Sequence, residues 1–207
     1  MYYADWDLDR YVRENFFRDF NYKGTMVEVG AGPPKFISCS KHFRNFGWRC
    51  ICVDPNPKFV QQHKDDGSEI YQYACCDREG EANFTINLNN DNWYSSENDG
   101  VSFSSLGIRY DNLPEHNSQS VITVQTIKLN TLLENVGVQK VDYVCIDVEG
   151  WELDVMRGFD TTKYQPRVIV MENIKSNIEY KQYMNSIGYE RQTILTLNDV
   201  YVNSRYF

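Results

Sequence analysis

The stretch MVEVGAGPPKF, residues 26–36, passes from an apolar run into a glycine turn and then into two prolines. An apolar run that ends in Gly30-Ala31-Gly32 is typical of the point where a parallel strand leads into a helix. Two features distinguish this stretch from a dinucleotide-binding loop. Two prolines follow the turn, and Lys35 replaces the third glycine of G-x-G-x-x-G. Proline has no N–H with which to bind a pyrophosphate. The turn therefore argues against NAD and FAD, and without a following Gly-Lys-Ser/Thr it is no P-loop.

Segments with strand and helix character alternate on both sides of this turn. Five buried strands are expected, over residues 24–30, 48–54, 69–76, 141–147 and 166–173. Helices are expected over residues 35–47, 57–67, 149–159 and 176–189. This alternation predicts an α/β fold with a doubly wound, mostly parallel sheet and helices on both faces. Residues 191–202 are interpreted as a C-terminal antiparallel hairpin turning at Asn198-Asp199, and residues 80–88 as an added antiparallel strand.

The chain is expected to form one domain over residues 1–207, because this length suits a single core and no linker divides it. Apolar residues at mostly helical spacing predict an N-terminal helix within residues 1–22. Residues 87–120 form a polar insertion rich in Asn, Ser, Asp and Gly. A long irregular segment in a compact domain is often functional, so the insertion is a candidate substrate lid, and an insertion without a role is the alternative. Aromatic residues that it offers for stacking are Trp93, Tyr94, Phe103 and Tyr110.

The charge balance is acidic, with 29 Asp and Glu against 21 Lys and Arg and a net charge of −8. No basic stripe is present, which argues against nucleic acid and against an anionic membrane surface as partners. No run approaches the roughly 18 apolar residues of a membrane span, and the first residues lack the pattern of a signal peptide. Six cysteines without zinc-type spacing are interpreted as reduced core residues, and the three histidines as surface residues. These features predict a cytoplasmic protein with a small-molecule partner and leave the oligomeric state open.

Acidic residues follow all five predicted core strands. In an open parallel sheet, the residues just after the strands line the ligand site where the strand order reverses. Here the acidic residues at these positions are Glu28, Asp54, Asp77, Asp147, Glu149 and Glu172. Such an edge suits a cationic ligand better than a phosphate.

Asp54 lies 22 residues after Gly32 (54 − 32 = 22), where an acidic side chain can accept both hydroxyls of a ribose. The alternative is that Asp54 only caps a helix that begins at Pro55. Gly30 and Gly32 would let a nucleoside approach the backbone closely, and Glu28 adds negative charge near its polar tail. A nucleoside with an amino-acid tail and a positive sulfur fits this pattern, so we predict S-adenosylmethionine as the cofactor.

The stretch VDYVCIDVEGWELDVMRGF, residues 141–159, places Asp147 and Glu149 side by side at the same edge, and Gly150 permits a sharp turn into the following helix. Alternatively, Glu149 caps that helix and Asp147 is only a polar residue at the end of a strand. Glu172 at the end of the next strand favours the functional interpretation.

Six stretches occur in the order and spacing of the FkbM family of S-adenosylmethionine-dependent methyltransferases, which the chain resembles over nearly its whole length from about Gly24. They are VEVGAGPPKF, CVDPNPKFV, YACCDREGEANF, TIKLNTLLE, DYVCIDVEGWELDVMRGF and RVIVMEN. The resemblance implies a Rossmann-like class I methyltransferase fold and O-methylation of sugars or polyketide-type natural products. It implies that the cofactor is held by Glu28, Gly30, Ala31, Gly32, Asp54 and Pro55, with Cys76 or Asp77 beside the adenine and Asp147 near the methyl group.

The chain departs from the family pattern at two places. The usual glycine turn is closer to D-x-G-A-N-x-G, so Glu28, Gly32 and the two prolines differ. The lysine that often precedes I-D-x-E-G is Cys145 here.

We therefore predict O-methyl transfer to a small-molecule or glycan hydroxyl, with Asp147, Glu149 or Glu172 as the general base. No residue is assigned as a metal ligand, and a divalent cation held by these carboxyl groups is an alternative that we rank lower. Two rival functions stay open. One is a nicotinamide-dependent oxidoreductase, which the prolines and the lack of a Tyr-x-x-x-Lys pair disfavour, and the other is a non-catalytic nucleoside-binding module.

Overall fold

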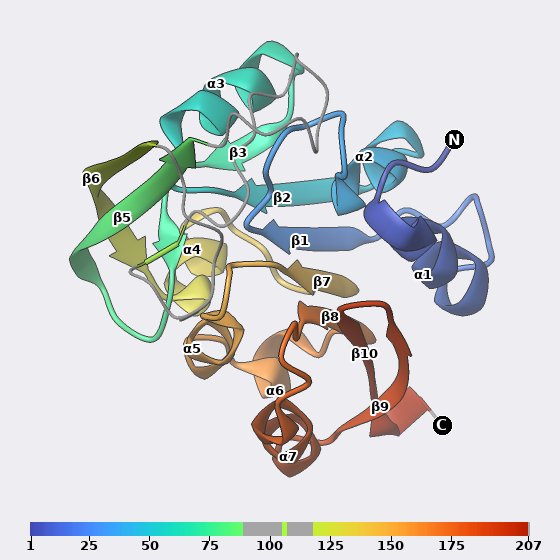
Figure 1. The fold of residues 1–207 in the computed structure, drawn as a ribbon. Helices are drawn as coiled ribbons and strands as arrows, with labels where there is room; N and C mark the ends of the chain where they lie inside the picture. Colours follow the sequence, from blue (N-terminus) through green and yellow to red (C-terminus); the bar gives the residue numbers. More distant parts are fainter. Residues whose placement is uncertain (89–104, 107–117, 207) are drawn as a thin grey trace.

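A computed structural model describes residues 1–88, 105–106 and 118–206, and a mostly parallel sheet forms their centre. The strands of this sheet are β1 (Thr25–Val29), β2 (Arg49–Val53), β3 (Glu69–Tyr71), β7 (Tyr143–Ile146), β8 (Val168–Glu172), β9 (Tyr189–Leu195) and β10 (Asn198–Asn203). Their order is β3-β2-β1-β7-β8-β10-β9 (Figure 1). The strands from β3 to β8 in this order pair in parallel. The last two form an antiparallel hairpin in which β10 also runs antiparallel to β8.

Helices cover both faces of the main sheet. On one face, α1 (Leu8–Phe16) and α2 (Cys39–Asn45) pack in a core that includes Met26 and Val170. On the other face, α4 (Leu129–Asn135), α5 (Glu152–Arg157), α6 (Thr161–Tyr164) and α7 (Ile178–Ser186) pack in a core that includes Val27 and Ile169. The remaining helical elements are η1 (Asp5–Asp7), α3 (Pro57–Asp65) and η2 (Ser204–Tyr206). The predicted α/β fold with a doubly wound sheet and a C-terminal antiparallel hairpin is confirmed.

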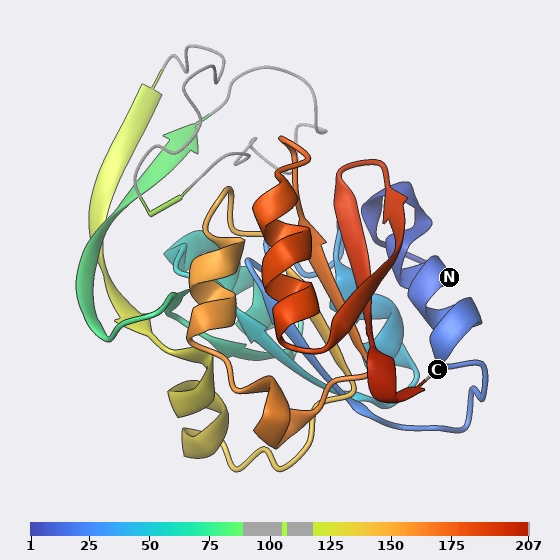
Figure 2. The same ribbon diagram turned by 90° about the horizontal axis from the view of Figure 1, so that it is seen from below.

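A second sheet stands beside the first and consists of β4 (Ala74–Cys75), β6 (Ser118–Ile127) and β5 (Gly80–Leu88), in that order. The predicted strand over residues 80–88 is present as β5 and pairs antiparallel with β6. Figure 2 shows β5 and β6 as a long curved pair that extends away from the main sheet. The single strand expected over residues 69–76 is wrong, because the chain leaves the main sheet after Tyr71 and β4 pairs with β6. A strand has the same side-chain period in either sheet, so the sequence pattern carries no sign of this change of partner.

Three other local expectations differ from the structure. The helix expected from residue 35 begins only at Cys39, because the prolines precede a turn in which Ile37 has a φ of 48°. The C-terminal hairpin turns at Thr196-Leu197, since β10 already begins at Asn198. Helix α6 was not expected at all.

Two of the histidines predicted to lie at the surface are buried. His42 is 1% exposed and His63 is 0% exposed. The six cysteines are buried free thiols, as predicted. Within the part of the chain that the structure describes, no helix is long and apolar enough to cross a membrane. A cytoplasmic location and the division into one domain stay predictions.

Most of the predicted polar insertion lies outside the described residues, and the four aromatic residues proposed to stack on a substrate lie there too. The described part includes Ser105 and Leu106. Ser105 pairs with Thr85 of β5 through two backbone hydrogen bonds of 3.0 and 3.1 Å.

Candidate active site

The main sheet reverses its order between β1 and β7, and a cavity of about 310 Å³ lies at the carboxyl ends of these strands. This is where the general rule for open α/β sheets places a ligand. Residues at the carboxyl ends of four strands line the cavity. They are Gly30, Gly32 and Pro33 after β1, Asp54, Pro55 and Asn56 after β2, Asp147, Val148 and Glu149 after β7, and Glu172 at the end of β8. No Lys, Arg or His is among the described residues of the lining. Four of the five predicted strand ends therefore meet at one site, and the site is acidic.

The glycine turn after β1 has no backbone N–H left for an anionic ligand. Two of the amides of residues 30–32 donate to the carbonyl of Val53, at 2.9 and 3.1 Å, and the third donates to Oδ2 of Asp54 at 2.9 Å. The next two residues, Pro33 and Pro34, have no N–H at all. Five consecutive positions thus offer no donor to a phosphate, the anion that unpaired amides at helix N-termini bind.

Both glycines of the turn have positive φ, for different reasons. Gly30 (φ 77°) approaches β7 so closely that a Cβ atom would lie 1.7 Å from the backbone oxygen of Asp147. Gly32 (φ 54°) has open space around its Cβ position, with no described atom within 4 Å. On the buried side, His63 donates from Nε2 to the Gly32 carbonyl at 3.0 Å. The turn is therefore fixed by packing behind it and open toward the cavity.

Asp54, at the end of β2, is buried and lines the cavity. Its Oδ2 accepts a hydrogen bond from the Gly32 amide at 2.9 Å, and its Oδ1 accepts one from the Asn56 amide at 2.8 Å. Burial raises the pKa of Asp54 to about 6, although the two N–H donors act in the opposite direction. Each carboxylate oxygen keeps a second lone pair for a ligand hydroxyl. Asp54 does not cap α3, since that role belongs to Asn56, whose Oδ1 accepts from the Lys58 amide at 3.0 Å.

Glu28 lies on the other face of β1 and lines a second cavity of about 60 Å³. Side chains alternate along a strand, so Glu28 points to the α2 side, where its Oε1 accepts from the Cys39 amide at 2.6 Å. Burial raises its pKa. The two cavities adjoin, because Gly30, Asp147 and Asn198 line both of them. Glu28 therefore anchors the beginning of α2 next to the main cavity and lies outside the described lining of that cavity.

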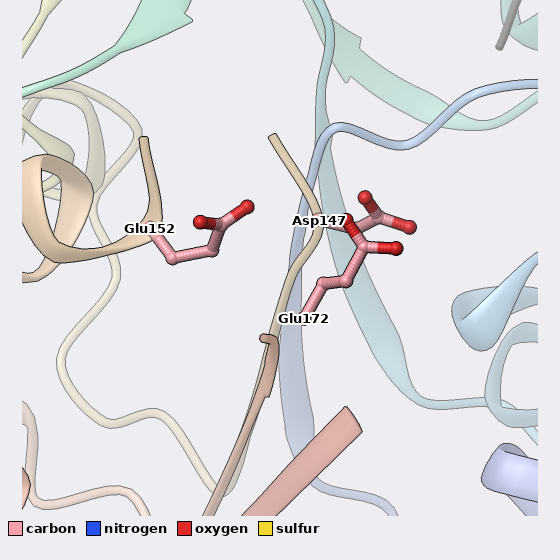
Figure 3. Close-up of side chains that lie close together, drawn as sticks. All are labelled: Asp147, Glu152 and Glu172. Atoms are coloured by element: carbon pink, nitrogen blue, oxygen red, sulfur yellow. The ribbon is translucent and has the colours of Figure 1, made fainter. Parts of the chain in front are cut away.

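Asp147 and Glu172 form a hydrogen-bonded pair of carboxyl groups in the main cavity (Figure 3). Asp147 follows β7 and Glu172 is the last residue of β8, and these strands are neighbours in the sheet, with Ile146 paired to Met171. Surrounding protein atoms desolvate both groups and raise their pKa, although Asp147 stays exposed to the cavity. The repulsion between neighbouring carboxylates adds to the effect, and the larger shift falls on Glu172. When two carboxyl groups are hydrogen-bonded to each other, ionisation of one disfavours ionisation of the other. Desolvation and this repulsion both favour the state in which the pair keeps one proton.

Glu152, the first residue of α5, is a third member of this cluster that the sequence analysis missed. One carboxylate oxygen from each of Asp147, Glu152 and Glu172 lies within 4.8 Å of the others (Figure 3). Glu152 accepts two hydrogen bonds at Oε1 from amides of the loop 147–150, at 3.0 and 3.1 Å, and one at Oε2 from the Tyr180 hydroxyl at 2.5 Å. It holds the loop that carries Asp147. The signal in the sequence was a carboxylate in the first turn of the predicted helix, where amide donors gather.

Three further predicted residues surround the same site. Glu149 lines the cavity from the loop after β7, in a left-handed conformation with a φ of 57°. Its negative charge contributes to the raised pKa of Glu172. Pro55 also lines the cavity, whereas Ala31, the middle residue of the glycine turn, is 4% exposed and outside the described lining.

The residues that form the cavity wall next to β3 differ from Cys76 and Asp77, which were expected beside the adenine. Cys76 and Asp77 lie outside the described lining, because the chain has passed into the second sheet. Residues 73–75 and Phe59 form this wall instead. Asn56 adds a polar group, since its buried Nδ2 has no hydrogen-bond partner among the described residues.

The opposite side of the cavity is lined by residues that the sequence analysis did not foresee. Asp5 and Trp6 come from η1, ahead of α1, and Phe84 comes from β5. Ser105 and Leu106 come from the polar insertion. These residues are far from the strand ends in sequence, so no strand-end rule could have selected them.

The strand order, the reversal between β1 and β7 and the mostly parallel pairing define a Rossmann-like methyltransferase fold. The family model of the Methyltransferase FkbM domain matches residues 28–198. The chain therefore belongs to the FkbM methyltransferase family. No curated protein sequence matches it.

Proposed function

We propose that the chain transfers the methyl group of S-adenosylmethionine to a hydroxyl oxygen of a small-molecule or glycan acceptor in the main cavity. The glycine turn without free donors carries this proposal. A cofactor with a pyrophosphate requires N–H groups at that turn, and the five positions have none to give. A nucleoside without phosphates requires only close approach to the backbone, which Gly32 permits.

The lining fits such a cofactor part by part. The carboxylate of Asp54 has lone pairs for ribose hydroxyls. The Nδ2 of Asn56 is a buried donor, and Phe59 and Tyr73 offer apolar surface for the adenine. The cluster after β7 and β8 supplies negative charge for a sulfonium ion. When bound, S-adenosylmethionine supplies an activated methyl group on a positively charged sulfur.

Asp147 is our candidate for the general base. The acceptor oxygen must lose its proton as it becomes methylated, and Asp147 is exposed to the cavity. Its raised pKa brings it closer to neutrality, where a general base is most effective. Glu172 has the larger upward shift, so it keeps the shared proton and donates it in a hydrogen bond to Asp147. Glu149, in the same loop, is the alternative base.

A divalent cation fits this cluster poorly. Glu152 already accepts hydrogen bonds at both carboxylate oxygens, and the Asp147–Glu172 pair is held by a shared proton that a cation would displace. Calcium and magnesium require several free oxygen donors. We therefore propose a reaction whose proton transfer depends on the carboxyl pair.

Two measurements test the function. Calorimetric titration with S-adenosylhomocysteine and then with NAD is expected to show binding of the first and none of the second, and the reverse result would support the oxidoreductase. Methyl transfer from labelled S-adenosylmethionine is then measured against a panel of glycans, small alcohols and lipids. Cofactor binding without transfer to any acceptor would favour the non-catalytic nucleoside-binding module.

A further inference from the structure

We propose that Asp5 and Trp6, in the turn before α1, form the acceptor subsite of the main cavity, and that this subsite receives an uncharged polyhydroxylated ring such as a saccharide. The inference rests on the proposed function, because it takes the main cavity as the place of methyl transfer. It adds the residues that recognise the acceptor and the charge that the acceptor must have.

Both residues line the main cavity from a segment that precedes α1. Asp5 and Trp6 line the same cavity as Asp147 and Glu172, and the Asp5 carboxylate is near enough to contribute to the raised pKa of Asp147. Trp6 is 62% exposed, although it is a large aromatic side chain. The family match begins at residue 28, so this wall of the cavity is a feature of the chain outside the matched domain.

The turn that presents Trp6 is anchored on both sides. Trp6 and Asp7 have positive φ values of 56° and 55°, a conformation that costs energy for residues other than glycine and persists only where the surroundings enforce it. Asp9 supplies one anchor, because its carboxylate accepts from the Tyr3 amide at 2.7 Å and from the Arg10 amide at 2.8 Å. The second anchor is apolar, since Leu8 and Val12 of α1 are buried in the core on the α2 side of the sheet. The indole is therefore held at the cavity by the fold.

The chemistry of this wall selects for the charge of the acceptor. An exposed indole offers a flat apolar face on which a ring can pack, and carboxylates accept hydrogen bonds from hydroxyl groups. The described lining contains no Lys, Arg or His to bind an anion, so Asp5 and the carboxyl pair would repel a carboxylate or phosphate. A cationic acceptor would be repelled by the sulfonium ion beside the same pair. An uncharged ring with several hydroxyl groups meets neither obstacle.

The test uses the full chain saturated with S-adenosylmethionine, which carries the sulfonium ion, and three probes that differ in charge. These are methyl glucoside (uncharged), glucuronate (anionic) and glucosamine (cationic). The indole N–H signal of Trp6 in ¹H–¹⁵N spectra, assigned with Trp6→Phe, is expected to move on titration with methyl glucoside and to stay in place with the other two. A signal that moves with glucuronate or glucosamine and not with methyl glucoside would overturn the proposal, as would a signal that no probe moves.

Turnover supplies the second readout, with the acceptor that the panel of glycans and alcohols identifies. Trp6→Ala is expected to raise the acceptor KM by about tenfold, the size of effect that loss of one aromatic contact produces, and to leave the affinity for S-adenosylhomocysteine unchanged. The matched control is Tyr206→Ala, which removes an aromatic side chain that is 47% exposed and lies outside the described lining. An unchanged KM in Trp6→Ala would overturn the subsite and leave the function standing. If the wild-type chain binds no S-adenosylhomocysteine, the proposed function fails and the subsite with it.

Discussion

At the scale of single residues, Asp147 is the side chain on which turnover depends most directly. Asp147→Asn keeps the size of the side chain and removes its ability to accept a proton, so kcat is expected to fall by ~10²–10⁴-fold, the contribution of a general base. Calorimetry should show unchanged affinity for S-adenosylhomocysteine. Asp154→Asn is the matched control, because Asp154 is an acid on α5 outside the described cavity lining. Full turnover in Asp147→Asn with normal cofactor affinity would exclude Asp147 as the base.

Asp54 gives a prediction about pH at the same scale. Burial raises its pKa to about 6, and the ionised carboxylate is the stronger acceptor for ribose hydroxyls. A ligand that prefers the ionised form lowers this pKa, so affinity for S-adenosylhomocysteine is expected to fall as the pH drops through about 6. Calorimetric titrations above and below that pH measure the effect. Asp54→Asn should bind more weakly at neutral pH and lose the dependence; an unaltered dependence in the variant would assign it to another group.

At the scale of elements, the end of β1 and the end of β7 meet at Gly30. A Cβ atom there would lie 1.7 Å from the Asp147 backbone oxygen, so Gly30→Ala must push the two strand ends apart. We expect a loss of unfolding free energy on the order of 4 kcal/mol, or failure to fold. Gly32→Ala is the control, since its Cβ meets no described atom within 4 Å and its cost is about 1–2 kcal/mol from the positive φ alone. Urea unfolding compares the two, and equal losses would contradict the packing at β7.

The elements also show why part of the site escaped sequence analysis. Glu152 falls within the predicted helix 149–159, and its role comes from the loop 147–150, whose amides donate to it. Glu28 was assigned to the cofactor from its place in the strand, and the alternation of β1 turns it toward α2. Cys76 and Asp77 were assigned to the site because their strand was expected in the main sheet, whereas β4 belongs to the second one.

At the scale of the whole molecule, buried acids determine how stability changes with pH. Desolvation by the surrounding protein raises the pKa of five carboxyl groups in or near the cavities, namely Glu28, Asp54, Asp147, Glu152 and Glu172. A carboxyl group with a raised folded-state pKa contributes stability below its ordinary pKa of about 4 and loses that contribution as the pH rises through the raised value. His63 acts in the opposite sense, since burial lowers its pKa to about 4. Its contribution to stability rises with pH up to the ordinary histidine pKa of about 6.5 and is constant above it.

The melting temperature of the chain without cofactor is therefore expected to fall as the pH rises from about 6.5 to about 8. Glu172→Gln replaces an acid that must stay protonated, so this variant should melt higher than the wild type at the upper pH and depend less on pH. Each kcal/mol shifts the melting temperature of a domain of this size by about 2–4 °C, which calorimetry resolves. Glu190→Gln, on the exposed part of β9, is the matched control. A Glu172→Gln variant with the wild-type pH dependence would show that the carboxyl pair does not hold this proton.

The sequence by itself determined the alternating α/β fold, the glycine turn followed by two prolines, and the acids Asp54 and Asp147 at strand ends. These features depend on local periodicity and on the covalent nature of glycine and proline, which neighbouring residues reveal. Only the tertiary structure decided that Glu152 supports the loop of Asp147, that Glu28 faces the smaller cavity, and that Trp6 lines the main cavity. Each of these depends on contacts between residues far apart in the chain, and such contacts form only when the packing of the helices and sheets brings the residues together.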